Sequence, residues 1–446
     1  MAALPGRRAI GRGRRSIRAG WALRAGFAEG RERGETVPDP GAVERGATAD
    51  PAGFAPEAAP RHVYVHVPFC GAKCHYCDFA VFVGPRTPWE ALYLEALERE
   101  LALVLAPYGG AYPFPIETLY LGGGTPTALS PAALERLFDL LERAFPRRAP
   151  GMEWTVEANP EGLVGDEGRA LLRWLRGRGT TRLSIGVQTF DDAQLSALGR
   201  RHTGREAEAA VLAAREAGFV HLSLDLIYGL PGQTFEGWTA DVRRAFGLPI
   251  DHLSAYALEV AEATRFGRMQ AAGALPLPDD DRVVEMYAFV AAAARDAGFE
   301  PYEVSNFARP GGRSRHNLAY WNNRPYFGFG PGAHGYAFGV RTANVPSLPR
   351  YVRARTLSEF RTEVRPVGRR EAIEETMFLG LRLAEGVRRD AFRRRFGVDL
   401  EDVYGPVLRR LEAEGLIVID ARGIRLPEAV RPVMNAVLAE FLFDDR

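Results

Sequence analysis

The chain has 446 residues, of which 46% are hydrophobic and 25% are charged, a balance typical of globular proteins that are long enough for two domains. Its formal net charge is +1, so composition gives no electrostatic argument for nucleic acid or an anionic membrane as the main partner. The sequence contains no apolar run of about 18 residues, the length that predicts a transmembrane helix.

Residues 1–58 are rich in Arg, Gly, Ala and Pro and lack sustained apolar periodicity, which predicts a disordered or non-native extension. The first 28 residues contain many arginines and no acidic residue, a composition similar to that of a mitochondrial transit peptide, although serine is scarce. An over-extended start codon in a GC-rich bacterial gene is the simpler explanation. We therefore expect a cytoplasmic protein, with a mitochondrial location as the alternative.

From His62 onward, short apolar runs alternate with amphipathic stretches. We expect strands at 62–67, 117–121, 152–157, 182–187, 221–227 and 252–258. We expect helices at about 88–106, 131–145, 166–178, 191–199, 205–217 and 235–247. Six strands that alternate with helices predict parallel βα units. In such folds ligands bind at the carboxyl ends of the strands.

The regular alternation stops after about residue 300, which separates the expected barrel at 59–300 from the rest of the chain. Residues 301–367 form an aromatic- and Gly-rich segment and a linker. Residues 368–446 are expected to be mostly helical, with a short strand pair at 416–419 and 423–426. This pattern predicts a smaller, winged-helix-like C-terminal domain.

All three cysteines, Cys70, Cys74 and Cys77, follow the first predicted strand. An odd number so closely spaced is no disulfide framework and indicates a metal or redox role in a reducing compartment. Iron–sulfur clusters normally take four thiolates, so one iron would lack a protein thiolate unless His66 or His75 binds it. The alternative is a Cys3His zinc site, although structural zinc usually takes cysteine pairs from two separate segments.

The spacing C-x3-C-x2-C after a first strand resembles the signature of the radical S-adenosylmethionine (SAM) superfamily. In that superfamily SAM chelates the open iron of a [4Fe-4S] cluster and is cleaved to a 5'-deoxyadenosyl radical and methionine. The resemblance implies that the three cysteines hold such a cluster and that SAM is a cofactor. It also implies that Tyr76, the aromatic residue before the last cysteine, packs near the adenine.

Further motifs follow the later predicted strands. The run L121-G-G-G-T125-P-T follows the second strand, and its glycines allow a backbone to approach a ligand closely, although a tight turn has the same pattern. Polar residues close the next three strands, namely Glu157, Gln188 and Asp225, and Arg200 lies one helix after Gln188. Because the carboxyl ends of parallel strands meet at one edge, we expect these side chains to converge at one barrel mouth.

The motifs GGGTPT, EANPE, GVQTF, LGRRHT and DLIYGLPGQT together closely resemble the family of coproporphyrinogen III dehydrogenase (HemN) and heme chaperone HemW over about residues 62–440. The resemblance implies an α/β fold, a partial (β/α)6 barrel with a smaller C-terminal domain. By matching motifs, it implies SAM contacts from Tyr64, Gly123, Gly124, Thr125, Glu157, Gln188, Arg200 and Asp225, with Tyr76 and Ala257 as further matches.

Two features distinguish the members of this family. The dehydrogenase has a fourth cysteine two residues after the third, whereas this chain has Phe79, as heme chaperones do. The sequence H316-N-L-A-Y-W321 resembles the HNxxYW motif of heme chaperones. The resemblance implies heme as a ligand, with His316 and then His334 as candidate axial ligands. A structural role for His316 in a turn, with the two aromatic residues of the motif in the core, is the alternative.

The resemblance thus implies a heme chaperone that binds heme, a [4Fe-4S] cluster and SAM and transfers heme to hemoproteins such as respiratory cytochromes. It also implies an electron donor such as flavodoxin or ferredoxin and transient contact with a membrane protein, but no nucleic acid. The alternative is the dehydrogenase reaction, a SAM-dependent oxidative decarboxylation of coproporphyrinogen III. A further radical SAM reaction on heme is a third possibility that no residue selects.

Overall fold

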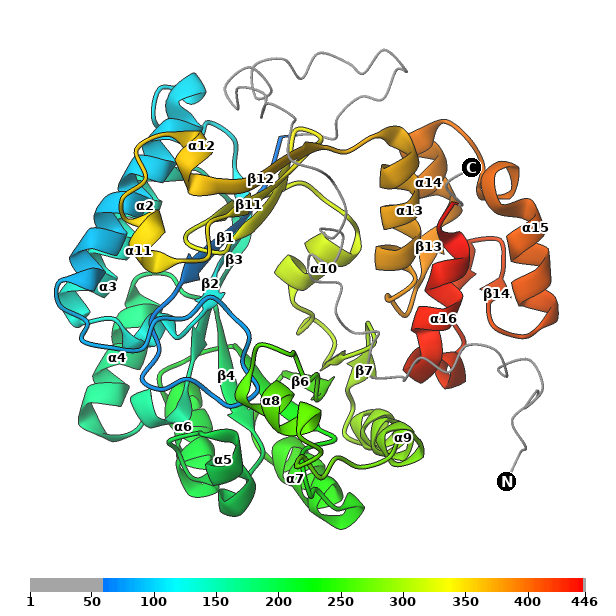
Figure 1. Cartoon of the computed structure of the whole chain (residues 1–446), viewed down its shortest axis with the longest axis horizontal. Helices are drawn as coiled ribbons and strands as arrows, with labels where there is room; N and C mark the ends of the chain where they lie inside the picture. Colours follow the sequence, from blue (N-terminus) through cyan, green and yellow to red (C-terminus); the bar gives the residue numbers. More distant parts are fainter. Residues whose placement is uncertain (1–58, 444–446) are drawn as a thin grey trace.

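The computed structural model describes residues 59–443, so the expectations for residues 1–58 lie outside the described part of the chain. Six parallel strands form the centre of a twelve-stranded sheet with the order β12-β11-β10-β9-β1-β2-β3-β4-β5-β6-β8-β7. The curved sheet does not close on itself, and helices cover its outer face (Figure 1). The expected partial (β/α)6 barrel is therefore confirmed.

The six parallel strands overlap the six predicted ones. They are β1 (His62–Val67), β2 (Ile116–Gly123), β3 (Arg148–Ala158), β4 (Arg182–Gln188), β5 (His221–Tyr228) and β6 (His252–Ala257). The helices between them are α2 (Trp89–Leu105), α3 (Pro131–Ala144), α4 (Gly165–Gly177), α5 (Asp192–Leu198), α6 (Gly204–Glu216) and α7 (Phe235–Gly247). Short 3-10 turns follow or precede some of them, at Ala106–Tyr108, Pro126–Ala128 and Pro160–Gly162.

Local sequence explains where several of these elements begin. The Ser130 hydroxyl accepts a hydrogen bond from the Ala133 amide and caps α3, whose first residue is Pro131. Asp191 caps α5 in the same way. In β1, the fully buried Val63 and Val65 alternate with polar residues, as expected of a strand with one face against helices and the other toward the barrel interior.

Both edges of the parallel sheet carry extra strands. The added elements are α8 (Arg265–Ala271), α9 (Asp280–Asp296), β7 (Glu300–Pro301), β8 (Asn306–Ala308), α10 (Arg315–Trp321), β9 (Tyr326–Phe329), β10 (His334–Ala337), β11 (Val340–Asn344), α11 (Leu348–Tyr351), α12 (Leu357–Phe360) and β12 (Arg361–Pro366). Strand β9 pairs in parallel with β1, and β8 pairs antiparallel with β6. Helix α10 lies between the barrel strands and the C-terminal domain (Figure 1).

The C-terminal domain combines helices with a small antiparallel sheet of order β13-β15-β14. Its elements are α13 (Arg369–Gly380), β13 (Val387–Arg388), α14 (Arg389–Phe396), α15 (Leu400–Ala413), β14 (Val418–Ile419), β15 (Gly423–Arg425), a 3-10 turn (Glu428–Val433), α16 (Met434–Leu438) and a last 3-10 turn (Ala439–Phe441). The predicted strand pair is confirmed as β14 and β15, within a mostly helical domain. Within residues 59–443, no helix has the length and hydropathy that a membrane span requires.

Candidate functional site

The three cysteines lie in the loop after β1, and each is half-buried. Cys70 Sγ is 3.7 Å from Thr125 Oγ1 in the turn after β2. Arg200 Nη1 lies 3.5 Å from Cys74 Sγ and donates to it. The cysteine loop, the glycine-rich turn and Arg200 therefore meet at the carboxyl ends of the first strands, where the sequence predicts the site.

Neither neighbouring histidine is available as a fourth ligand in this conformation. His66 Nδ1 bonds the Tyr64 hydroxyl at 3.1 Å, and its Nε2 bonds the Ala80 carbonyl at 2.9 Å. His75 Nδ1 bonds the Ala197 carbonyl at 2.8 Å, and its Nε2 contacts Arg265. In the described part of the chain, no group of three or more His, Cys, Asp and Glu side chains is arranged to hold a single metal ion. Three thiols without a histidine fit a cluster with one open iron better than a Cys3His zinc site.

The electrostatics of the loop couple cluster binding to proton release. Burial raises the pKa of Cys70 to about 11, although the contact with Thr125 lowers it. Burial also raises the pKa of Cys77. Without metal these two thiols are thus protonated at neutral pH, whereas iron binds thiolates. Assembly of a cluster here releases protons and becomes easier as pH rises.

Glycine is required where the turn after β2 meets the cysteine loop. The Gly123 backbone has φ of +96°, and a Cβ at this position would lie 2.2 Å from His66 Nδ1. A Cβ at Gly124 would lie 2.5 Å from the Val67 carbonyl, which accepts the Gly124 N–H at 2.9 Å. The turn is thus fixed against the end of β1, and this packing explains both glycines whether or not they also contact SAM.

Two carboxyl groups face the barrel interior near the turn. Glu157 accepts hydrogen bonds from the Tyr120 hydroxyl at 2.7 Å and from the Gly123 N–H at 3.0 Å. Ser184 donates to Asp225 at 3.2 Å. Burial raises the pKa of Glu157 to about 7 and that of Asp225 to about 6, in each case against the lowering effect of the hydrogen bonds. Both groups therefore titrate close to neutral pH, and both present acceptors to a polar ligand.

Gln188 ends β4 in a left-handed conformation, with φ of +71°. The following residues hold this conformation, because Asp241 of α7 accepts from the Thr189 hydroxyl at 2.6 Å and from the Phe190 N–H at 2.9 Å. A non-glycine residue with positive φ is a locally strained conformation of the kind that clusters at ligand sites. Sequence reasoning missed Asp241, since it lies in the middle of a helix about 50 residues away and outside every motif.

Asn159 was also missed, although it lies within the EANPE motif. Its side-chain NH2 donates to Thr125 Oγ1 at 3.1 Å, and its Oδ1 accepts from Arg200 Nη2 at 2.7 Å. Arg200 Nη2 also donates to the Gly186 carbonyl at 2.5 Å. Asn159 thus connects the glycine-rich turn, β3 and the Arg200 guanidinium in one network that ends at Cys74.

The remaining predicted SAM residues lie around the same barrel mouth. Tyr64 of β1 is paired in register with Tyr120, and the two rings are 6.0 Å apart. Tyr76 packs against a small apolar cluster that includes Leu198 and Phe266. Ala257 is the last residue of β6 and is half-buried. The structure thus brings the predicted residues together, and contact with SAM remains our prediction for each of them.

The two heme candidates differ in their surroundings. His316 in α10 is 1% exposed, and its ring nitrogens bond Thr118 Oγ1 at 2.7 Å and the Tyr320 hydroxyl at 2.9 Å. Trp321 ends the same helix, and the Arg382 guanidinium lies 4.3 Å from the centre of its ring. His334 begins β10 and is exposed. The first candidate is therefore inside the protein and the second is at its surface.

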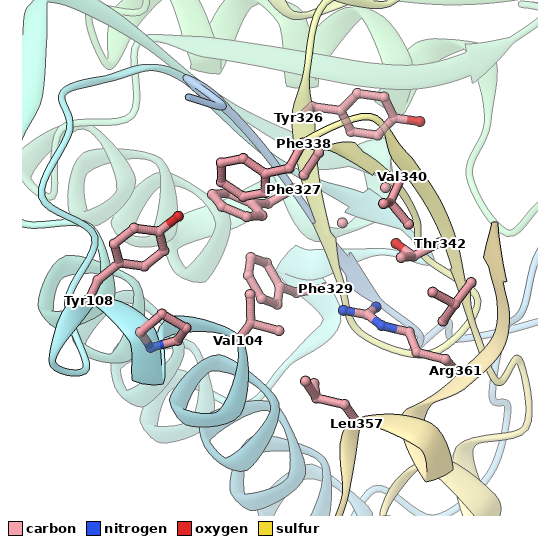
Figure 2. Close-up of a pocket in the computed structure, with 15 residues that line it drawn as sticks. Val104, Tyr108, Tyr326, Phe327, Phe329, Phe338, Val340, Thr342, Leu357 and Arg361 are labelled. Atoms are coloured by element: carbon pink, nitrogen blue, oxygen red, sulfur yellow. The ribbon is translucent and has the colours of Figure 1, made fainter. Parts of the chain in front are cut away.

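A separate hollow lies outside the barrel, between the end of α2 and strands β9–β12 (Figure 2). Its lining is mostly aromatic and aliphatic and includes Tyr108, Phe329 and Phe338. Arg361 also lines it, but its guanidinium donates to the buried Glu100 at 3.2 Å. The lining contains none of the predicted cluster or SAM residues, so this hollow is distinct from the barrel mouth.

The sequence of the chain was compared with known protein families and proteins. The sequence matches the model of the radical SAM superfamily over residues 64–245 and that of the HemN C-terminal domain over residues 367–433. It is 38% identical to the heme chaperone HemW of Bacillus subtilis, over 86% of this chain and 99% of that protein. It is 33% identical to HemW of Escherichia coli, over 86% of this chain and 98% of the relative. The chain belongs to the HemW family.

The chain is also similar to a mouse protein and to a solved bacterial structure. The chain is 33% identical to mouse radical S-adenosyl methionine domain-containing protein 1, mitochondrial, over 96% of this chain and 95% of that protein. Among solved structures, it resembles coproporphyrinogen III oxidase (HemN) of E. coli with a TM-score of 0.75 and 24% identity, over 88% of this chain and 92% of that one. This structural similarity establishes the shared fold of the two proteins.

HemW proteins carry a radical SAM domain, and here that domain spans the three cysteines and the barrel mouth. A [4Fe-4S] cluster and SAM are therefore cofactors of this chain. The residues present fit both groups: three half-buried thiols lie in one loop whose histidines are bonded elsewhere, and two carboxyls and a strained glutamine lie at the adjacent mouth.

Proposed function

We propose that this HemW-family chain is a heme chaperone, which binds heme and transfers it to acceptor hemoproteins. The observation that carries the proposal is similarity over nearly the whole of a heme chaperone: 86% of this chain aligns with 99% of the B. subtilis protein at 38% identity. Phe79 supports it as well, since this residue occupies the position of the dehydrogenase's fourth cysteine and is 45% exposed beside the cysteine loop.

We assign the cofactor residues as follows. Cys70, Cys74 and Cys77 hold the cluster, which when reduced supplies one electron to bound SAM. Arg200 and Asn159 fix the cysteine loop relative to the turn after β2.

We assign the polar groups on strands β3, β4 and β5 to SAM itself, although Asp225 lies within β5 and not at its end. Glu157 and Asp225 accept hydrogen bonds from its hydroxyl and ammonium groups, and Gln188 borders the same space. Tyr76, which packs against the small apolar cluster, lies beside the adenine.

For heme we propose contact with the aromatic segment that begins at α10. His334 is the axial-ligand candidate that we favour, because its side chain is exposed at the surface, whereas His316 is buried and 1% exposed. A neutral imidazole is a common ligand of heme iron. A His334→Ala variant should therefore lose the spectrum of histidine-ligated heme.

The alternative function is oxidative decarboxylation of coproporphyrinogen III. One observation favours it: the barrel and the C-terminal domain share their fold with E. coli HemN. The exposed Phe79 counts against it, because the dehydrogenase has a cysteine at this position.

One experiment separates the two functions. Anaerobically reconstituted full-length protein is titrated with heme and, in parallel, assayed with coproporphyrinogen III, SAM and reductant. We expect saturable binding near one heme per chain and no protoporphyrinogen IX. Turnover beside an active control dehydrogenase would favour the alternative, and absence of saturable heme binding would contradict the chaperone assignment.

We further propose partners and a location that follow from this function. Acceptors include respiratory cytochromes, which entails transient contact with membrane proteins, and a flavodoxin or ferredoxin supplies electrons to the cluster. A cytoplasmic location suits free thiols that must bind iron. Mitochondria are the alternative, since a mouse relative is named as mitochondrial.

A further inference from the structure

The HNxxYW helix is attached to the barrel interior by a buried ion pair. Glu153 of β3 accepts hydrogen bonds from the backbone N–H groups of Arg315 and His316, at 3.2 and 3.0 Å. Arg182 of β4 lies 3.1 Å from the same carboxylate and also donates to the Gly312 carbonyl at 2.7 Å. The Arg182 and Glu153 side chains are 2% and 5% exposed. Strands β3 and β4 therefore fix the first turn of α10.

The ring of His316 has no nitrogen left for iron in this position. Burial lowers the pKa of His62 to about 4 and that of His316 well below its usual range, so both imidazoles are neutral. Thr118 Oγ1 contacts Nδ1 of both rings, at 2.9 and 2.7 Å. The Tyr320 hydroxyl bonds the other nitrogen of His316. In either tautomer the unprotonated nitrogen of His316 accepts a hydrogen bond from Thr118 or Tyr320.

The same ring leads directly to the barrel mouth. His316 stacks on Tyr120, with ring centres 5.0 Å apart and an angle of 28° between the planes. The Tyr120 hydroxyl then donates to Glu157, which also accepts the Gly123 N–H. His316, Tyr120, Glu157 and the glycine-rich turn thus form one continuous chain of contacts from α10 to the cofactor loop.

We propose that His316 is a positioning residue of the SAM pocket: its ring holds Tyr120, and Tyr120 orients the Glu157 carboxylate toward SAM. Under this proposal, the HNxxYW motif connects α10 to the SAM pocket through His316, and His316 is not a ligand of the heme iron. The inference rests on the SAM contact of Glu157 in the proposed function, but not on heme transfer.

The pH dependence of SAM affinity reports on this chain of contacts. The ionisable groups that face Glu157 are Tyr120 on β2, Asp225 on β5, Tyr256 on β6 and Tyr320 on α10. Among the side chains of residues 59–443, only the Tyr120 hydroxyl donates to this carboxylate. Weakening this bond raises the pKa of Glu157, so the pH at which SAM affinity is half-maximal should move upward.

The test uses the anaerobically reconstituted full-length chain and measures the Kd for SAM by calorimetry over a pH series. Tyr120→Phe should raise the Kd about tenfold, the size of one lost hydrogen bond to a charged group. His316→Ala should raise it about threefold or more and shift the pH midpoint in the same direction. His316→Phe keeps the stacked ring and should restore both values.

His252→Ala is the matched control. His252 is also buried in the barrel, with its nitrogens bonded to Ser223 Oγ at 2.7 Å and to the Tyr302 hydroxyl at 2.8 Å, but Tyr120 is not among these partners. The His252→Ala variant should have a lower unfolding temperature than the wild type, but the same pH midpoint of SAM affinity. If His316→Ala does not fold, Tyr120→Phe and His316→Phe decide the test.

A heme titration of the same variants completes the test. The heme spectrum of His316→Phe should equal that of the wild type, and its loss with unchanged SAM affinity would overturn the inference and make His316 an iron ligand. An unchanged pH midpoint in Tyr120→Phe would also overturn it. If wild-type protein fails to bind heme, the chaperone function fails, while the SAM measurements still decide the role of His316.

Discussion

The guanidinium of Arg200 donates to Asn159 Oδ1 over 2.7 Å, and the same guanidinium lies 3.5 Å from Cys74 Sγ. The two residues come from separate motifs, yet together they connect the cysteine loop with the ends of β3 and β4. Burial lowers the pKa of Arg200, but the contacts with Tyr76, Cys74 and Glu161 outweigh this effect and raise it above its usual value. A permanent positive charge therefore lies beside the cysteine loop, where it lowers the pKa of Cys70 against the larger raising effect of burial.

Replacing Arg200 with lysine should weaken SAM binding. A single ammonium group on a flexible stem does not reproduce the planar fork that reaches Asn159, the Gly186 carbonyl and Cys74 together. We expect the Kd for SAM to rise about tenfold, as for one lost charged hydrogen bond. Calorimetry checks this value. The neighbouring exposed Arg201→Lys is the control and should change the Kd little.

Each cysteine should be required for the intact cluster. Cys70→Ser, Cys74→Ser and Cys77→Ser replace a soft thiolate by a hydroxyl that binds iron poorly. We expect iron and acid-labile sulfide to fall to a small fraction of the wild-type content, with loss of the cluster absorption and electron paramagnetic resonance signals. His75→Ala should keep both signals, since that ring bonds Ala197 and Arg265. A lost signal in His75→Ala would show that the fourth iron has a histidine ligand.

Glu157 should make the protein less stable as pH rises. Burial raises the pKa of Glu157 from 4.5 to about 7 in the folded chain. Between these values the folded state binds a proton that the unfolded state has released, so the free energy of unfolding falls as pH increases. In Glu157→Gln the fall over this window should be smaller. Urea unfolding of cluster-free protein at several pH values measures it, and an unchanged slope would contradict the pKa shift.

Removing one partner of the buried ion pair Arg182–Glu153 should lower the free energy of unfolding. Arg182→Met leaves a buried carboxylate without its counter-charge, which costs about 3–5 kcal/mol of unfolding free energy. The double replacement Arg182→Met with Glu153→Leu should recover part of this loss, because no isolated charge remains. Denaturant unfolding gives both values. A single-variant loss below about 1 kcal/mol would show that solvent reaches the pair.

Much of the barrel could be predicted from the sequence because its signals are local. The strands β1 to β6 carry alternating or continuous apolar runs, and helices such as α3 start at a serine cap followed by proline. Because the strands and helices alternate, the sequence also shows that the cysteine loop and the polar site residues lie at or after predicted strands. Their meeting at one barrel mouth is a consequence of parallel topology.

The elements between residues 301 and 346 were not predicted, because their cause is tertiary. A Cβ at Gly328 of β9 would lie 1.9 Å from the His334 carbonyl, and one at Gly330 would lie 2.3 Å from the His66 carbonyl. These glycines permit close packing of the strands, but a glycine-rich segment is predicted as a loop when only the sequence is known. Asp241 likewise has no local signal, since its role depends on contact with a strand end far away in the chain.

The most direct test of the account is heme transfer. Full-length protein loaded with one equivalent of heme is mixed with an apo-cytochrome, and the absorption spectrum of the separated acceptor is followed with and without cluster and SAM. We predict that heme moves from this chain to the acceptor faster than from serum albumin loaded to the same level. Transfer no faster than from albumin, together with turnover of coproporphyrinogen III, would contradict the chaperone function.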